Sequence, residues 1–383
     1  MNVAIAPKSI TAAALRVEWR PLDAMDAALS AWRALAARAL EPNVFYEPAF
    51  ARAAEPVFGE DVGAGLVWLH DKLIGFFPGR IERRYLVPPA VLTGWTHPYA
   101  PLGTPLIDRD DGAAALSAWL DHMTQDAALP ALWLLPFLPD GPFARTLDAT
   151  LAIRNGRSAR FGGHRRALLA PKERADYLTR SLGAKKRKEL RRQRHRLEHA
   201  GSLLTDITTE ASAISGALAD FLALEAHGWK GRAGSAARAH PPIRRFMAAA
   251  VSTLAAEGKA RVDRLLLAGR PIAACVTLRS GNTAWTWKIA YDEAHARASP
   301  GVQIMHDLTE SLLADTTIAR VDSCATADHP MIDHMWRERL SLADRLIAVR
   351  PARMAFAAAC YLETLRRDAH DAAKSLRDRL RGR

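Results

Sequence analysis

A turn of small residues, Ser299-Pro300-Gly301, separates an apolar run from a segment with helical periodicity. Apolar residues follow it at spacings of three and four (Val302, Met305, Leu308 and Leu312), which places them on one helical face. A helix that begins at such a turn points its first unpaired N–H groups forward, and its dipole adds partial positive charge. The turn therefore predicts a cradle for phosphate or pyrophosphate. An ordinary strand-to-helix connection is the competing interpretation.

Positive charge is concentrated in one stretch of the chain. The formal net charge is +12, and Lys172–Ala200 holds eleven Lys and Arg against four Asp and Glu, a net +7. Leu182, Leu190 and Leu197 give this segment a thin apolar stripe, and Gly201 ends it as a helix. Such a helix is a solvated surface, a site for phosphate or another anionic substrate, or a nucleic-acid contact. The sequence shows no interleaved aromatics, recognition helix or zinc module that favours nucleic acid.

The elements that must position the Ser-Pro-Gly turn are strands. Three apolar, β-rich runs precede it, separated by two tight turns that contain glycine: Arg261–Ala268, Ile272–Arg279 and Thr283–Ala290. A helix, a strand, a short helix and a further strand follow the turn, up to Leu346. The order predicts an α/β unit in which a mixed sheet is flanked by helices.

Length and composition limit the class of protein. A chain of 383 residues with 49% apolar and 25% charged residues suits two soluble globular domains. We find no apolar run long enough to span a membrane and no signal peptide pattern at the N-terminus. Three widely separated cysteines (Cys275, Cys324 and Cys360) form no metal or disulfide pattern, so we expect a cytoplasmic protein without a metal.

The chain also looks internally doubled. Ala64–Ile81 and Asp263–Arg279 both read as an apolar strand, a polar turn and a second strand. Leu129–Phe143 and Ile318–Ile332 both read as a strand followed by a proline-containing turn into a helix. We expect two domains of one type, over residues 12–165 and 172–350, followed by a C-terminal helix over 351–383.

This order of elements resembles the GNAT acyltransferase fold, and two such units in tandem resemble FemAB-type transferases. The amino-acid sequence of several segments is similar to that of CelD/BcsL-type acetyltransferases of cellulose and exopolysaccharide synthesis. These segments are Pro42–Phe50, Pro101–Asp108, Lys185–Gly201, Phe221–Ala236, Trp287–Glu293, Ser299–Gln303 and His329–Arg339. The resemblance implies an acyltransferase with two tandem GNAT-like domains, of which the second binds acetyl-coenzyme A and the first shapes the substrate cleft.

The resemblance also implies a coenzyme site. GNAT enzymes bind pyrophosphate with an Arg/Gln-x-x-Gly-x-Gly/Ala turn, and this chain has Arg297 through Val302 there, with Pro300 and Val302 at glycine positions. Because Pro300 lacks an N–H group, Gly301, Val302 and Gln303 are the expected donor amides, supported by Arg297 and Ser299.

A catalytic tyrosine is not found where the resemblance places one. GNAT enzymes often protonate the leaving thiolate with a helix-borne Tyr, and Trp336 stands at that position. We expect His329 to act as general base, because imidazole titrates near neutral pH, with Asp328 or Asp333 orienting it. A structural role beside Pro330 is the competing interpretation for His329.

Several residues are candidates for the acceptor side. In FemAB-like proteins a similar basic helix lies beside the substrate, which implies that Lys188, Arg191 and Arg192 bind an anionic acceptor. The glycine-rich loop after Phe221–His227 offers two more candidates, Trp229 for stacking on a sugar and Lys230 for a carboxylate or phosphate. Core packing or a helix C-cap is the competing interpretation for this loop.

One strand offers two further candidates for the acceptor side. Trp287 shares a strand face with Trp285 and either packs in the core or contacts substrate. Tyr291 ends that strand near the expected thioester.

The last segment reads as an amphipathic helix. Phe356, Tyr361, Leu365 and Ala369 recur at about helical spacing, and Leu376 and Leu380 continue the pattern. We expect this face to dock on the body of the protein. Adsorption to an anionic membrane is the alternative.

The sequence therefore predicts acyl transfer from acetyl-coenzyme A to an amine or hydroxyl of a saccharide, free or lipid-linked. A FemAB-like aminoacyl transfer from aminoacyl-tRNA and a non-catalytic adaptor of the same fold are the alternatives. The oligomeric state, the acyl group and the acceptor are left open.

Overall fold

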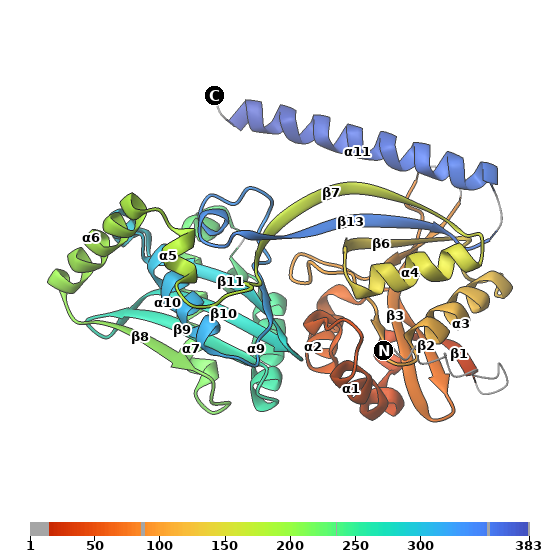
Figure 1. Cartoon of the computed structure of the whole chain (residues 1–383), viewed down its shortest axis with the longest axis horizontal. Coiled ribbons are helices and arrows are strands. Elements are labelled where there is room, and N and C mark those ends of the chain that lie inside the picture. Colours follow the sequence, from red (N-terminus) through yellow and green to blue (C-terminus); the bar gives the residue numbers. More distant parts are fainter. Residues whose placement is uncertain (1–14, 86–88, 235, 351–352, 382–383) are drawn as a thin grey trace, which may run out of the picture.

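The computed structural model describes residues 15–85, 89–234, 236–350 and 353–381. In these residues a single mixed sheet runs through two halves in the order β1-β2-β3-β4-β6-β13-β7-β12-β11-β10-β9-β8, and β5 (Leu106–Ile107) pairs with β3. Helices pack on it in both halves (Figure 1). The expected α/β class with a mixed sheet flanked by helices is confirmed.

The first half contains one set of strands and helices. Its strands are β1 (Leu15–Pro21), β2 (Val62–Leu69), β3 (Lys72–Glu82), β4 (Val91–Gly94) and β6 (Leu132–Pro139). Its helices are α1 (Leu29–Ala37), α2 (Pro48–Phe58), α3 (Gly112–Gln125) and α4 (Pro142–Ile153).

The second half repeats much of this order. Its strands are β8 (Leu203–Thr208), β9 (Ala260–Leu267), β10 (Arg270–Ser280), β11 (Thr283–Tyr291) and β12 (Arg320–Asp322). Its helices are α5 (Tyr177–Ser181), α6 (Ala184–Ala200), α7 (Ile214–His227), α8 (Trp229–Arg232), α9 (Pro241–Ala256) and α10 (Pro300–Ala314). The turns before β10 and β11 hold Gly269 and Gly281 at φ of 77° and 53°, which glycine adopts without strain.

The expected internal doubling is visible as two antiparallel hairpins, β2–β3 and β9–β10. The second expected match holds only in part. β6 is followed by the full helix α4, whereas β12 is followed by a three-residue 3₁₀ turn at Ile332–His334. Helix formation fails there because the segment is short and its chain returns at once into β13.

Two long strands join the halves. β7 (Arg157–Leu169) and β13 (Glu338–Ala348) pair antiparallel along their whole length, from Arg157 opposite Ala348 to Leu168 opposite Glu338. β13 also pairs with β6 of the first half, and β7 pairs with β12 of the second. Each half therefore receives a strand from the other, as the crossing ribbons of Figure 1 show.

One hydrophobic cluster continues from one half into the other. Phe50 and Phe58 of α2 meet Phe246 of α9 edge-on, with ring centroids 5.4 and 5.6 Å apart. Trp287 of β11 packs 5.6 Å from Phe50 in the same cluster. The halves are thus fused by a shared apolar core as well as by the exchanged strands.

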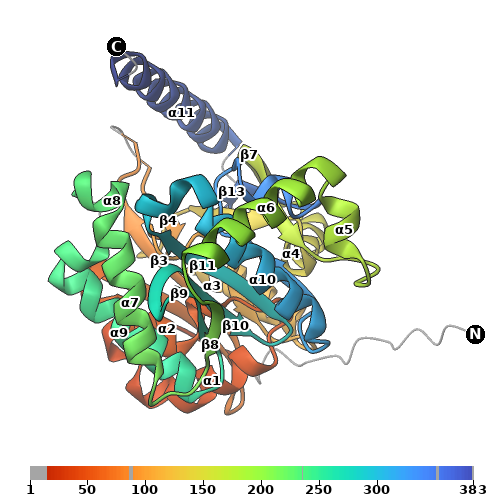
Figure 2. The same ribbon diagram turned by 90° about the vertical axis from the view of Figure 1, so that its left-hand side faces the viewer.

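The C-terminal helix α11 (Arg353–Arg381) lies outside this core and extends away from the body (Figures 1 and 2). It docks as expected, but only part of the predicted face does so: Phe356 packs on the body, whereas Tyr361 and Leu365 are 65% and 45% exposed. Ala359, which is fully buried, and the fully buried carboxylate of Glu363 complete the contact. The side chains of Leu376 and Leu380 lie outside the described residues.

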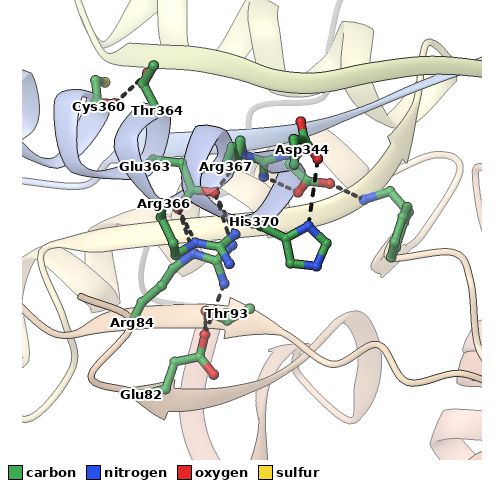
Figure 3. A network of polar contacts seen from close by, with 12 residues as sticks. Glu82, Arg84, Thr93, Asp344, Cys360, Glu363, Thr364, Arg366, Arg367 and His370 are labelled. Atoms are coloured by element: carbon green, nitrogen blue, oxygen red, sulfur yellow. Dashed lines mark hydrogen bonds and ion pairs between the residues drawn. The ribbon is translucent and has the colours of Figure 1, made fainter. Parts of the chain in front are cut away.

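Three guanidinium groups surround the Glu363 carboxylate (Figure 3). Arg84 binds both of its oxygens at 2.8 and 3.1 Å, and Arg366 and Arg367 donate to it at 3.0 and 2.7 Å. Burial alone raises the pKa of Glu363, but hydrogen bonds and charge from Arg84 and Arg366 outweigh burial and lower it to about 2. Arg367 also pairs with Asp344 of β13, so the network ties α11 to the exchanged strand.

Replacement of Glu363 by Gln is expected to release α11 from the body. Loss of one partner from a buried ion network costs about 3–5 kcal/mol, because the remaining charges stay buried without compensation. Limited trypsin digestion followed by mass spectrometry should show new cleavage within residues 353–381.

Asp371→Asn, on an exposed stretch of the same helix, is the matched control and should leave digestion unchanged. The folded pKa of Glu363 lies below its ordinary value, so this stabilisation is complete above pH ~4.3 and is lost as the pH falls through about 2. Equal protection of the Glu363→Gln helix would contradict the role given to this carboxylate.

Candidate active site between two diverging strands

The sheet of the second half opens between β11 and β12. These parallel strands pair only at Thr283–Arg320, Ala284–Val321 and Trp285–Asp322 and then diverge. A cavity of ≈170 Å³ lies in the gap. Its walls are Cys275, Thr286, Trp287, Lys288, Ile289, Met305, Ser323, Cys324, Ala325, His329, Met331 and Ile332. Within the described residues, no strand pairs with this edge of β11 beyond Trp285, so its backbone groups can meet a ligand.

A β-bulge lies on β11 at the same place. Lys288 pairs with Val276 and Thr286 with Thr277, so Trp287 is the extra residue. A bulge bends its strand and redirects side chains. The Trp287 indole N–H donates to the carbonyl oxygen of Tyr99 in the first half at 2.7 Å. The bulge therefore joins the cavity rim to the first half.

A buried ion pair supports the opposite wall. Arg166 of β7 donates to Asp322 of β12 at 2.5 Å, and both side chains are 3% exposed. Burial disfavours the charged guanidinium, but the Asp322 carboxylate outweighs burial and raises the pKa of Arg166. The other Asp322 oxygen accepts the Cys324 amide at 3.0 Å, and Arg166 also donates to the carbonyl oxygen of Pro101 at 3.0 Å. Arg166 of β7 therefore links the cavity wall at Asp322 to the loop of the first half at Pro101.

His329 lies in the cavity wall and is half-buried. Its Nδ1 lies 3.4 Å from the backbone N–H of Met331, a long contact in which Nδ1 accepts. At this length the contact does not fix the tautomer of the neutral ring, so either ring nitrogen can serve as a proton acceptor. The two carboxylates expected to orient His329 have other surroundings. Asp333 lies 3.9 Å from Arg339, and Asp328 is exposed to solvent.

The expected phosphate cradle begins α10. Ser299 caps it in the left-handed conformation at φ 52°, and its carbonyl oxygen accepts the amides of Val302 and Gln303 at 2.9 and 3.1 Å. Of the three predicted donor amides, Gly301 alone has no backbone acceptor among the described residues. A Cβ on Gly301 would lie 2.9 Å from the Tyr291 ring. Tyr291, predicted to bind substrate, therefore lies against the coenzyme turn.

The other predicted coenzyme residues face different partners. The Gln303 side chain is buried and donates to the carbonyl oxygen of Leu190 on α6 at 3.0 Å. Arg297 is exposed, and its carbonyl oxygen accepts from Arg196 at 3.2 Å. The basic helix α6 thus packs along α10 beside the cradle.

The face of α6 that packs is the predicted leucine stripe, since Leu190 and Leu197 are buried. Lys188 and Arg192 are exposed, and Arg192 pairs with Glu189 at 2.8 Å. Arg191 lines a groove of ≈540 Å³ between α6 and α10. The three predicted cations therefore share a helix but not one pocket.

The predicted Trp229 and Lys230 belong to helix α8, and their side chains lie outside the described residues. Beside α8, a small cavity of ≈40 Å³ is lined by Glu225, Tyr291 and Glu293 among others. Ile289 lines both this cavity and the larger one. The two cavities therefore lie along one strand.

Sequence reasoning missed two features of the site. One is the Arg166–Asp322 pair, which joins residues far apart in the chain. The other is the contact of Lys288 with the Tyr99 ring at 4.1 Å, whose signal in the sequence is a lysine within an otherwise uncharged strand. Both depend on the first half reaching the second.

His306, Asp307 and Glu310 on α10 bring three potential metal ligands within 4.8 Å of one another. Arg194 lies 3.1 Å from both carboxylate oxygens of Asp307, and Thr205 donates to the same carboxylate. Because Asp307 already pairs with a cation, we do not assign these three residues as a metal site. No helix of the described residues is long and apolar enough to cross a membrane.

The chain shares its fold with solved structures. FemX aligns with 84% of this chain and with 95% of its own length, at 9% identity and a TM-score of 0.54. The C-terminal domain of a putative lysylphosphatidylglycerol synthetase from Agrobacterium fabrum aligns with 86% of this chain and 93% of its own length. The identity is 12% and the TM-score is 0.53.

A conserved protein of unknown function from Bacteroides thetaiotaomicron matches 87% of this chain and 99% of its own, at 11% identity and a TM-score of 0.52. A search of curated proteins found no match. The family model for the acetyltransferase (GNAT) domain matches residues 184–329, which hold the diverging strands, the cradle and most of the cavity wall. The chain therefore shares the fold of these structures over most of its length, and residues 184–329 match the GNAT acetyltransferase domain model.

Proposed function

We propose that this protein transfers an acetyl or other acyl group from coenzyme A to an amine or hydroxyl of a saccharide. The cavity between β11 and β12 carries the proposal, because its wall combines an unpaired strand edge with His329 and with Met305 of α10. The GNAT match of residues 184–329 supports the donor class. The saccharide acceptor, in exopolysaccharide or envelope synthesis, rests on the sequence resemblance to CelD/BcsL-type proteins.

In this proposal the thioester lies in the cavity and the coenzyme phosphates lie at the N-terminus of α10. The open edge of β11 polarises the thioester carbonyl, and His329 takes the proton of the attacking group. Lys188, Arg191 and Arg192 hold an anionic part of the acceptor, the Trp229 loop contacts its sugar, and Tyr291 lies where the acceptor meets the coenzyme turn.

Replacement of Val302 by Glu should weaken coenzyme A binding. Val302 lies in the first turn of α10 and is partly buried against the core; an acidic side chain there suits the helix dipole but repels pyrophosphate. Isothermal titration calorimetry should show the Kd for coenzyme A rising about tenfold or more relative to Val302→Gln, which loses the same packing.

Val302→Gln is the matched control of the same shape without charge, and it should bind within about threefold of the parent. This position is a cleaner test than Gly301, where any side chain meets the Tyr291 ring. Equal affinity of the Glu variant and the Gln control would remove the cradle from the proposal.

His329→Gln should lower the rate of acyl transfer about 10²–10⁴-fold, the usual effect of losing a positioned base. The acidic limb of the pH–rate profile should disappear with it. The measurement is acetyl transfer to a panel of amino- and hydroxyl-bearing saccharides, followed by release of coenzyme A. Glutamine still donates a hydrogen bond, so near-parental activity with the limb intact would assign His329 a donating or structural role.

Substitution of Lys188, Arg191 and Arg192 together by Gln should raise the KM for the acceptor and leave coenzyme A affinity nearly unchanged. The reason is that these three exposed cations would contact an anionic acceptor and not the coenzyme, and their removal otherwise costs just the surface pair of Arg192 with Glu189. Lys185→Gln with Lys186→Gln on the same helix is the control for general loss of charge. Loss of coenzyme A binding alone would instead place these residues on the donor side, against which α6 packs.

Aminoacyl transfer from aminoacyl-tRNA is the second candidate, favoured by the exposed cations of α6 and by the FemAB-like resemblance. A thermal-shift comparison separates the candidates. A ligand at about 100 times its Kd stabilises the protein by roughly 2.7 kcal/mol. Stabilisation by tRNA, strongly weakened by salt, and not by coenzyme A supports the second candidate. Stabilisation by neither supports a non-catalytic adaptor.

A further inference from the structure

Acyl transfer from coenzyme A releases a thiolate, and its negative charge needs a partner in the site. Trp336 cannot provide one. It is fully buried, and its indole N–H donates to Thr309 Oγ1 at 3.0 Å. The thiols in the cavity wall are also unsuited, because burial raises the pKa of both Cys275 and Cys324 and keeps them neutral.

Lys288 is the one side chain of the described cavity wall that carries a formal charge, when histidine is counted as neutral. It follows the bulge residue Trp287 on β11, and its side chain is half-buried. Its ammonium nitrogen lies 4.1 Å from the ring centroid of Tyr99, a cation–π distance.

The first half helps to hold this ammonium group. Two adjacent residues of β11 contact Tyr99: the Trp287 indole N–H donates to its carbonyl oxygen, and the Lys288 ammonium group lies over its ring. Burial raises the pKa of Tyr99 to about 12, so the ring presents a neutral face to the cation. Burial and then the Lys288 charge lower the pKa of the neighbouring His97 to about 3, which agrees with positive potential at this rim.

We propose that the Lys288 ammonium group is the catalytic cation that stabilises the departing coenzyme A thiolate, an inference that rests on the proposed function. The acceptor nitrogen or oxygen forms a bond to the acyl carbon, and the carbon–sulfur bond breaks with its electron pair moving to sulfur. The acceptor proton goes to the base. The thiolate leaves paired with Lys288 and takes up a proton from the base or from water after release. No general acid at the Trp336 position is required.

The test measures the thiol pKa of bound coenzyme A, so it does not need the acceptor. Ultraviolet absorbance of the thiolate is followed against pH, with the complex of desulfo-coenzyme A as the blank. A positive charge in contact with the sulfur should lower the thiol pKa by about 1–3 units relative to free coenzyme A. Lys288→Met removes the charge and keeps the apolar stem, so this depression should disappear.

Lys288→Arg retains the charge and should retain most of the depression. Lys172→Met, at an exposed position in the loop before α5, controls for loss of one positive charge at a distance and should change nothing. If coenzyme A binds but its thiol pKa is the same in the parent and Lys288→Met proteins, the role of Lys288 is wrong and the proposed function stands. If the parent binds no coenzyme A, the proposed function itself fails.

Discussion

The antiparallel ladder between β7 and β13 is the constraint on which the rest of this structure depends. Its two strands are distant in the sequence, since β7 is the last strand of the first half and β13 is the last strand of the second. Because each strand also pairs in the other half's sheet, neither half has a complete sheet by itself. The edges left open in each half are paired by the exchange, which removes exposed N–H and C=O groups that would otherwise attract other strands. The strand exchange that completes each sheet therefore also fixes the two halves relative to one another.

The ladder also supports one wall of the cavity, because β7 pairs with β12. β12 has only three residues, and it is held on one side by the start of β11 and on the other by β7. Such a short strand cannot form a firm wall by itself. Arg166 strengthens it by placing a guanidinium group of β7 on the buried Asp322, which in turn holds the Cys324 amide. A buried pair of this kind contributes little net stability, but removal of either partner leaves an uncompensated charge. We interpret it as fixing the position of the wall.

Local signals allowed much of the fold to be predicted. Glycine turns at Gly269 and Gly281, apolar runs between them and the Ser299 turn located β9, β10, β11 and α10 to within a few residues. These signals are short-range, and long-range contacts were beyond them. Trp287 and Tyr99 are 188 positions apart, so no spacing rule relates them.

The docking face of α11 was predicted only in part for a similar reason. Periodicity marked Tyr361 and Leu365, but Arg84, distant in the sequence, pairs with Glu363 and turns that side of the helix toward the body. A buried carboxylate with three guanidinium partners outweighs the modest gain from covering a few apolar side chains.

The two halves also differ in what fills their strand gap. In the first half, β4 and β6 pair only at Leu92–Trp133 and Thr93–Leu134 before they part, as β11 and β12 do. There the chain itself occupies the gap: Gly103 lies so close to the carbonyl oxygen of Pro136 that no Cβ fits between them. The same loop then brings Tyr99 to Lys288 of the second half. The strand gap of the first half is thus closed by its own backbone, whereas the gap between β11 and β12 remains open as a cavity.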